Sequence, residues 1–258
     1  MNKSDLIEIF NREQRMDIVY PGTRREADEY VVRQISPEEE DSFISYSSLT
    51  AAHADAVIQR ELDYFAALGR RFEWKLYDFD EPADLKDRLA AHGFEIEDAE
   101  ALMIMKLDAA HPMITASIPD SIQRITDDAG IDALMALEDT IWQVSHQELG
   151  NRLKRDKRTM PEELLIYAAY DESGRIASGA WMYMYTGTAF CSFWGGSTLP
   201  EYRGKGFYKA LIAVRAQEAW KRGFRLLTVD ASPMSRPILE RNGFQCLGYT
   251  YPCKSPQI

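Results

Sequence analysis

The segment from Ser197 to Ala210, STLPEYRGKGFYKA, has the residue types and spacing of a site for a phosphate or pyrophosphate. An apolar strand ends there, a proline turn follows, and Gly204 and Gly206 open a long helix. Glycines let successive backbone N–H groups converge, and a helix N-terminus adds unpaired donors and a partial positive charge. Because Arg203 and Lys205 add full positive charges, the segment predicts an anion site.

Two common nucleotide loops do not fit this segment. A Walker loop requires GxxxxGK[ST], and here Lys205 is followed by Gly206. The Rossmann fingerprint requires a third glycine three residues after the second, and that position is Lys209. The alternative to an anion site is a plain glycine-containing turn between a strand and a helix.

Hydrophobic periodicity predicts the elements that position this loop. Strands 175–185 and 188–196 form an antiparallel hairpin around Thr186-Gly187. After the loop we expect a helix at 206–222, a strand at 224–230, a helix near 234–242 and a strand opened by Phe244. Before the hairpin we expect a strand at 122–126, helices over about 130–150 and 161–163, and a strand at 164–170. This order predicts an α+β fold, with a mixed, partly parallel sheet flanked by helices.

The N-terminal half contains part of the same order. It predicts a strand at 30–36, a helix at 54–69, a strand at 72–78, a helix at 82–91 and strands near 94–97 and 101–107. The stretches FEWKLYDFDEPADLKDRLAAHGF and FRLLTVDASPMSRPILERNGF both run from Phe through a strand, Asp, a proline loop and a helix to Gly-Phe. We interpret them as a degenerate internal repeat, with chance as the alternative.

The run PEYRGKG resembles the Arg/Gln-x-x-Gly-x-Gly/Ala acetyl-CoA loop of the GCN5-related N-acetyltransferases, the GNAT superfamily. The resemblance covers about residues 122–253, because the elements after the loop fall where that family keeps them. It implies a tandem arrangement of a degenerate GNAT-like half at 1–110, a linker at 111–121 and a catalytic GNAT-like domain at 122–258. The first half has no glycine loop between residues 36 and 54, so we expect it to bind no coenzyme.

The resemblance also implies which residues bind the coenzyme. The loop would present backbone N–H groups to the pyrophosphate, and the end of the preceding strand would pair with the pantetheine arm. The expected coenzyme-binding residues are Gly196, Thr198, Arg203, Gly204, Lys205, Gly206, Phe207, Tyr208, Ser232 and Ser235.

The sequence departs from the family pattern at two positions. Tyr208 stands where the motif prefers Gly or Ala, which we expect to narrow the approach to the phosphates. Leu239 stands where the family often has a tyrosine that protonates the departing thiolate. The general acid is therefore another group, a water or absent.

By resemblance, the reaction is direct attack of an acceptor amine on the thioester of acetyl-CoA. We expect the acceptor to be a primary amine on a small molecule, with a protein N-terminus or lysine as the alternative. Positioning carries most of the catalysis, with a backbone N–H near Thr198 polarising the carbonyl oxygen. The amine must lose a proton, yet the strand 188–196 has no acid that could serve as the base. Three other residues are candidates for the base: Asp230 at the end of its strand, and Glu138 and His146 in the helical region before strand 164–170. The alternative is that Asp230 is an ordinary cap or turn residue and that Glu138 and His146 are ordinary helix-surface residues. The aromatic residues at 181–194 are expected to divide between the core and an acceptor pocket.

Composition and charge set the remaining expectations. The chain has 258 residues, 45% hydrophobic residues and a net charge of −11, and residues 1–110 hold 13 Lys and Arg against 25 Asp and Glu. The acidic half disfavours nucleic acid and membrane partners and suits a cationic amine or simply solubility. Three cysteines without CxxC spacing, four scattered histidines and no apolar leader predict a cytoplasmic protein without a metal.

Two other functions compete with acetyl transfer. Loss of the tyrosine at Leu239 is compatible with a non-catalytic acyl-CoA-binding or sensor protein. A scaffold protein, in which the glycine loop is only a turn, is the third reading.

Overall fold

The computed structural model describes residues 1–37 and 40–257, which form two compact units. The first unit holds Met1–Met103, Asp230–Glu240 and the chain from Gln245 onward, and the second holds Ile104–Val229 and Arg241–Phe244. The first unit therefore includes residues near the C-terminus, whereas the sequence analysis assigned all of residues 122–258 to a single domain. The predicted boundaries near 110 and 122 stay a prediction.

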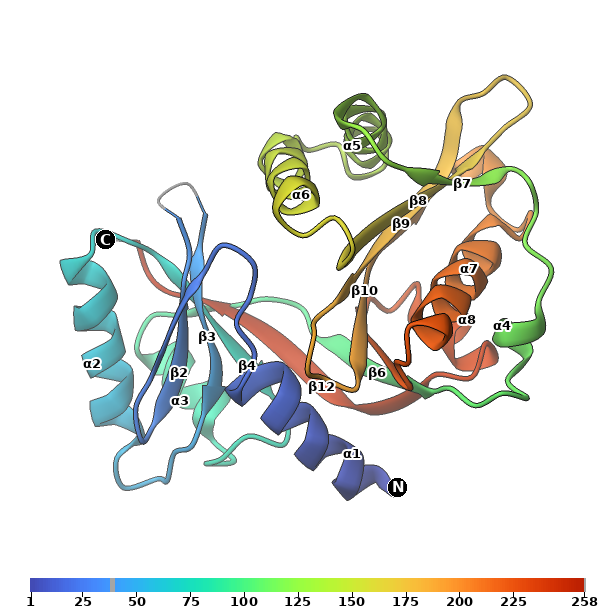
Figure 1. Ribbon diagram of the computed structural model, residues 1–258. Coiled ribbons are helices and arrows are strands. Elements are labelled where there is room, and N and C mark those ends of the chain that lie inside the picture. The colour runs from blue at the N-terminus through green and yellow to red at the C-terminus, as the bar shows by residue number, and fades with distance from the viewer. Residues whose placement is uncertain (38–39, 258) are drawn as a thin grey trace. The chain divides into compact units, whose positions relative to one another are not determined.

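The strands of the first unit lie in the sheet order β1-β2-β3-β4-β12, with β5 paired to β12. All of its pairs are antiparallel except β3 with β4. Its elements, coloured from blue to teal with β12 in red (Figure 1), are α1 (Lys3–Phe10), the π-helical turn η1 (Asn11–Met16), β1 (Arg24–Ala27), β2 (Val31–Ile35), β3 (Ser42–Ser47), α2 (Ala54–Ala67), β4 (Phe72–Tyr77), α3 (Leu85–Ala91), β5 (Glu95–Ile96) and β12 (Gln245–Lys254).

Helices cover both faces of β4. Its residues Phe72, Trp74 and Leu76 lie in one core with buried side chains of α2 and α3. Tyr77 points the other way, as strand alternation requires, and its ring meets Phe10 of α1 edge-on at 5.5 Å.

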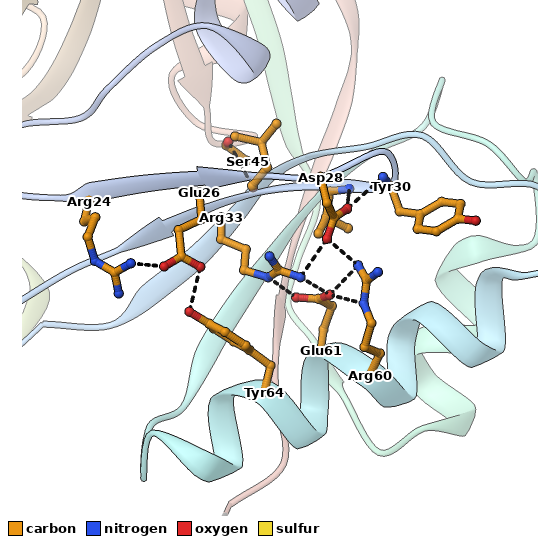
Figure 2. Close-up of polar contacts among 11 residues, drawn as sticks. Arg24, Glu26, Asp28, Tyr30, Arg33, Ser45, Arg60, Glu61 and Tyr64 are labelled. Carbon is orange, nitrogen blue, oxygen red and sulfur yellow. Dashed lines mark hydrogen bonds and ion pairs between the residues drawn. The ribbon is translucent and has the colours of Figure 1, made fainter.

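A buried ionic cluster joins α2 to β2 in the first unit (Figure 2). Glu61 of α2 is fully buried and accepts hydrogen bonds from the Arg33 guanidinium at 2.5 and 2.6 Å. Asp28 contacts Arg33 at 3.0 Å and Arg60 at 2.9 Å. Burial alone would lower the pKa of Arg33, but its hydrogen bonds and attraction to Glu61 raise it. Each charge is therefore offset by an opposite one.

The second unit contains a sheet in the order β11-β10-β9-β8-β7, antiparallel except for β10 with β11. Its elements are α4 (Pro112–Thr115), β7 (Ile122–Ile125), α5 (Asp128–Trp142), α6 (Gln147–Thr159), β8 (Leu164–Tyr170), β9 (Ile176–Met184), β10 (Phe190–Thr198), the 3₁₀ turn η2 (Pro200–Tyr202), α7 (Phe207–Lys221) and β11 (Leu226–Ala231). Three elements join the units along the chain: β6 (Glu100–Lys106), the end of β11 and α8 (Arg236–Arg241).

Helices α5 and α6 cover one face of the second sheet and α7 covers the other (Figure 1). Gly179 of β9 faces Leu134 of α5, which lies 2.1 Å from a Cβ built on the glycine. Four residues further along β9, Tyr183 donates to Asp156 of α6 at 2.8 Å. The mixed sheet between helices confirms the predicted α+β class.

The structure corrects parts of the predicted element order. The hairpin of β9 and β10 is confirmed, but residues 161–163 form a turn and the preceding helix α6 runs to Thr159. The elements α1, η1, β1 and β3 were not predicted. Five of the six aromatic residues at 181–194 are buried and Trp194 is exposed, and their division between the core and an acceptor pocket stays a prediction.

Candidate active site

Strand β10 contains a bulge directly before the glycine loop. The pairing of β10 with β9 shifts between Gly195 and Ser197, so Gly196 has no partner residue on β9. Both glycines have positive φ, +66° at Gly195 and +98° at Gly196, which other residues rarely adopt. Side chains also leave no room for a Cβ: Trp181 lies 2.4 Å from one built on Gly195, and Tyr208 lies 2.5 Å from one built on Gly196.

The parallel ladder of β10 and β11 ends just before this bulge. Its last pair is Ser192 with Thr228, whereas β10 continues its pairing with β9 to Thr198. The edge of β10 after Ser192 is thus outside the β11 ladder. An extended ligand can add to such an edge by main-chain hydrogen bonds.

The loop from Pro200 to Gly206 is anchored at its start and open at its end. Tyr202 donates to Asp171 at 2.5 Å, and Arg203 donates through Nε to the carbonyl oxygen of Thr198 at 3.2 Å. Gly204 and Gly206 have φ of +76° and +87°, and no described atom lies within 4 Å of a Cβ built on either. A ligand can therefore approach the backbone of the loop closely.

Helix α7 begins at Gly206 without a side-chain cap. Its first N–H groups, including those of Phe207 and Tyr208, thus keep their capacity to donate to an anion. The Lys205 ammonium lies 4.7 Å from the centre of the Tyr202 ring, beside this helix end. The glycines, cations and helix end have the donor set that the diphosphate of a coenzyme A thioester requires.

Tyr208 is the residue that we expected to narrow the approach to the phosphates. Its ring packs on Gly196 at the bulge of β10, on the side of α7. Tyr208 and Gly196, both expected to bind the coenzyme, are thus in direct contact.

Glu138 of α5 contacts the C-terminal end of β10, on the opposite face of the sheet from α7. Its Oε2 accepts from Ser197 Oγ at 2.6 Å and from Trp142 Nε1 at 3.0 Å. Its Oε1 is buried and has no hydrogen-bond partner among the residues that the structure describes. Burial raises the pKa of Glu138, although the bonds from Ser197 and Trp142 act in the opposite direction. A carboxylate with a raised pKa beside an open strand edge can accept a proton.

His146 is held by a different carboxylate. Asp139 accepts from the His146 backbone N–H at 2.6 Å and lies 2.9 Å from its Nδ1. The imidazole is thus tied to Asp139 of α5, and Glu138 is the candidate base that contacts β10.

Three of the expected site residues lie in the first unit: the candidate base Asp230 and the serines Ser232 and Ser235. Lys75 of β4 pairs with Asp230 at 3.0 Å. Burial alone would lower the pKa of Lys75, but Asp230 raises it well above its usual value. Ser232 and Ser235 form their own turn before α8, in which Ser235 N–H donates to Ser232 O at 3.1 Å.

Sequence reasoning missed the residues that position Glu138. Trp142 follows Glu138 by four residues, a spacing that places both on one helix face, so this signal was available. Ser197 is 59 residues away and only the fold brings it there. Buried Arg215, which contacts the bulge from α7, was also missed.

The described part of the chain contains neither a metal-ligand cluster nor a helix suited to span a membrane. Within residues 1–37 and 40–257, no group of three or more His, Cys, Asp or Glu side chains is arranged to hold a metal ion. No helix in the same residues has the length and apolar character needed to cross a membrane.

Residues 131–244 match the model of the acetyltransferase (GNAT) family. They form a GNAT acetyltransferase domain. The glycine loop, Glu138 and the bulge of β10 all lie inside this GNAT domain. No curated protein matches the sequence.

Solved structures extend the likeness to nearly the whole chain. A GCN5-related N-acetyltransferase from Kribbella flavida is 14% identical with a TM-score of 0.68, covering 98% of this chain and 94% of its own. A functionally unknown conserved protein from Staphylococcus epidermidis is 12% identical with a TM-score of 0.67, covering 93% and 96%. A tandem GNAT protein from the clavulanic acid biosynthesis pathway is 15% identical with a TM-score of 0.59, covering 93% and 85%. At these identities the likeness establishes the GNAT fold alone.

Proposed function

We propose that this protein is an N-acetyltransferase that moves the acetyl group of acetyl-CoA to a primary amine on a small molecule in the cytoplasm. The observation that carries the proposal is the loop Arg203–Gly206, open to ligand at the start of α7 and adjoining the part of β10 that lies beyond its ladder with β11. When bound, the coenzyme supplies an activated thioester. The loop N–H groups, Arg203 and Lys205 bind its diphosphate, while Gly196 and Thr198 align its extended arm.

The proposed proton path uses Ser197 and Glu138. The amine proton moves to Ser197 Oγ as the Ser197 hydroxyl proton moves to Glu138 Oε2, 2.6 Å away. The raised pKa of Glu138 makes it a stronger base than an ordinary glutamate. Trp142 Nε1, 3.0 Å from Glu138 and 3.2 Å from Ser197 Oγ, orients the pair.

The second candidate function is a non-catalytic acyl-CoA sensor. Leu239, at the position of the family's proton-donating tyrosine, is 1% exposed and supplies no proton. A sensor binds the thioester without releasing thiol, so turnover separates the two functions.

The test combines calorimetric titration with acetyl-CoA and a thiol-release assay over a panel of small amines. The control is a double variant, Arg203→Glu with Gly206→Trp, which reverses one charge and fills the open loop. We expect the wild type to bind and to release thiol with some amines, and the variant to do neither. Binding without thiol release for any amine supports the sensor. A folded wild type that does not bind acetyl-CoA contradicts both functions.

A further inference from the structure

Arg215 is a buried cation without an anionic partner. It lies in the middle of α7 and is 2% exposed. Within residues 1–37 and 40–257 its guanidinium donates only to backbone carbonyl groups, those of Leu211 at 2.9 Å, Trp181 at 3.0 Å and Trp194 at 3.3 Å. Among the described residues it forms no ion pair. It differs in this respect from buried Arg15 and Arg33 in the first unit, which pair with carboxylates.

Burying a charge without a counter-ion is costly, because the guanidinium loses its hydration. Burial accordingly lowers the pKa of Arg215, to about 10. Its remaining neighbours do not neutralise it: the Phe193 ring centre lies 4.1 Å from Cζ, and the nearby ionisable groups Tyr208, Cys191 and Tyr167 are uncharged at neutral pH. A methionine or leucine would pack in this helix without that cost.

The position of this charge is specific. The two carbonyl groups that accept from Nη1 belong to Trp181 and Trp194, which are register partners on β9 and β10 immediately before the bulge. Arg215 thus fixes the two strands at the point where β10 departs from regular pairing. By bonding the Trp194 carbonyl, it also polarises the peptide group that leads into Gly195.

The Arg215 guanidinium and Glu138, the proposed proton acceptor, lie on opposite faces of the sheet at β10. Arg215 and Tyr208 reach the bulge from α7, whereas Ser197 contacts Glu138 of α5. Helices α7 and α5 cover opposite faces of the sheet (Figure 1). The strand edge between them is the one to which the arm of an acyl-CoA would add.

We infer that Arg215 is a positioning residue for acyl transfer, which holds the bulge of β10 and supplies an unneutralised positive charge on the α7 side of the strand that the acyl-CoA arm would join. This inference rests on the proposed function. A fixed positive charge in a site of low dielectric constant stabilises a developing oxyanion more than the neutral ground state. A buried charge that lowers the stability of the fold is expected only where the charge has such a use.

The experiment measures binding of two coenzyme derivatives, so it does not depend on knowing the acceptor. Coenzyme A ends in a neutral thiol, whereas S-carboxymethyl-coenzyme A places a carboxylate near the acyl position. Calorimetric titration gives the ratio of the two affinities for wild type, Arg215→Lys and Arg215→Gln. Arg215→Lys keeps the charge, and Arg215→Gln keeps a neutral donor for the carbonyl groups.

We expect Arg215→Gln to lower the preference for the carboxymethyl derivative by about tenfold and Arg215→Lys by less than about threefold. Should Arg215→Gln not fold, Arg215→Met serves as the neutral variant with the same expectation. Equal preferences in the wild type, lysine and neutral variants overturn the inference and leave only a structural role for Arg215. Failure of the wild type to bind either derivative contradicts the proposed function itself.

Discussion

Glu138 is a carboxylate whose surroundings favour its protonated form, and its role as a base is testable. In Glu138→Gln the side chain keeps its size but cannot accept a proton, so we expect acyl transfer to slow by about 10²–10⁴-fold while coenzyme affinity is unchanged. A base works only when deprotonated, so wild-type kcat should fall as the pH falls through the pKa of Glu138. Because burial raises that pKa, this acid limb should lie above the range of an ordinary glutamate. The measurement is kcat against pH with an amine that supports thiol release from acetyl-CoA.

The matched control for Glu138 is Asp132, an exposed carboxylate on the same helix that pairs with Lys154. Asp132→Asn should retain the wild-type rate and acid limb. Retention of the acid limb in Glu138→Gln would assign that ionisation to another group.

The same burial predicts an effect on stability with a defined sign. A carboxyl group whose pKa is raised by folding binds its proton more tightly in the folded state. Its contribution is present below the unfolded pKa and is lost as the pH rises through the folded pKa. Glu138→Gln resembles the protonated form at every pH, so its Tm should exceed that of the wild type at pH 8 and approach it at pH 5. Thermal unfolding at both pH values checks this, and a lower Tm for the variant at pH 8 would mean that the ionised carboxylate is stabilising.

At the scale of elements, the cluster of Glu61 and Arg33 predicts how α2 is held to its sheet (Figure 2). In Glu61→Leu the buried guanidinium loses its main partner, and we expect a loss of about 3–5 kcal/mol in the free energy of unfolding. Adding Arg33→Met removes the charge that Glu61 no longer balances and should restore part of that loss. Urea unfolding of the single and double variants measures both effects.

Asp63 provides the control on the exposed side of α2, where it accepts from Gln59. Asp63→Ala should change the free energy of unfolding by less than about 0.5 kcal/mol. If the double variant were less stable than Glu61→Leu, Arg33 would be stabilising through its other contacts.

The elements that the sequence predicted are those with strong periodicity and clear ends. Helix α7 runs between Gly206 and Gly223, and β10 and β9 flank a glycine turn, so local signals sufficed. Strand β3 reads SFISYS and pairs on both sides, so its polar residues Ser42, Ser45 and Ser47 are buried by tertiary contacts that periodicity does not contain. Helix α1 carried a missed signal, the capping box of Asn2 and Asp5.

The two units contain the same local arrangement. In each, a strand leads through a helix to a parallel partner, β3–α2–β4 and β10–α7–β11, and each parallel ladder spans three residue pairs. A glycine with positive φ follows each helix, Gly69 and Gly223. This arrangement is what an internal repeat predicts, and the origin of the first unit as a degenerate GNAT-like copy stays a prediction.

For the whole molecule, contacts divide the chain differently from its sequence order. Strand β12, near the C-terminus, pairs with β4 of the first unit from Thr250 to Lys254. Periodicity identified the strand but not its partner, because a pairing between residues about 170 positions apart leaves no local signal. A fragment ending at residue 110 would lack this strand, so tests of the first unit require the full chain.

The full chain should bind one coenzyme molecule. The connection between β3 and α2, residues 48–53, contains neither glycine nor Lys or Arg, whereas the corresponding loop before α7 contains two glycines, Arg203 and Lys205. Calorimetric titration with acetyl-CoA should therefore give about one site per chain, and a ligand concentration a hundredfold above Kd should add about 2.7 kcal/mol of stability.

Lys205→Glu should weaken binding by about tenfold, because it replaces a cation near the diphosphate with an anion. Thr50→Glu places the same charge in the first connection, at an exposed residue, and should leave affinity unchanged. Two sites per chain, or equal losses in both variants, would show that the first unit also binds coenzyme and that glycines and cations do not distinguish the two units.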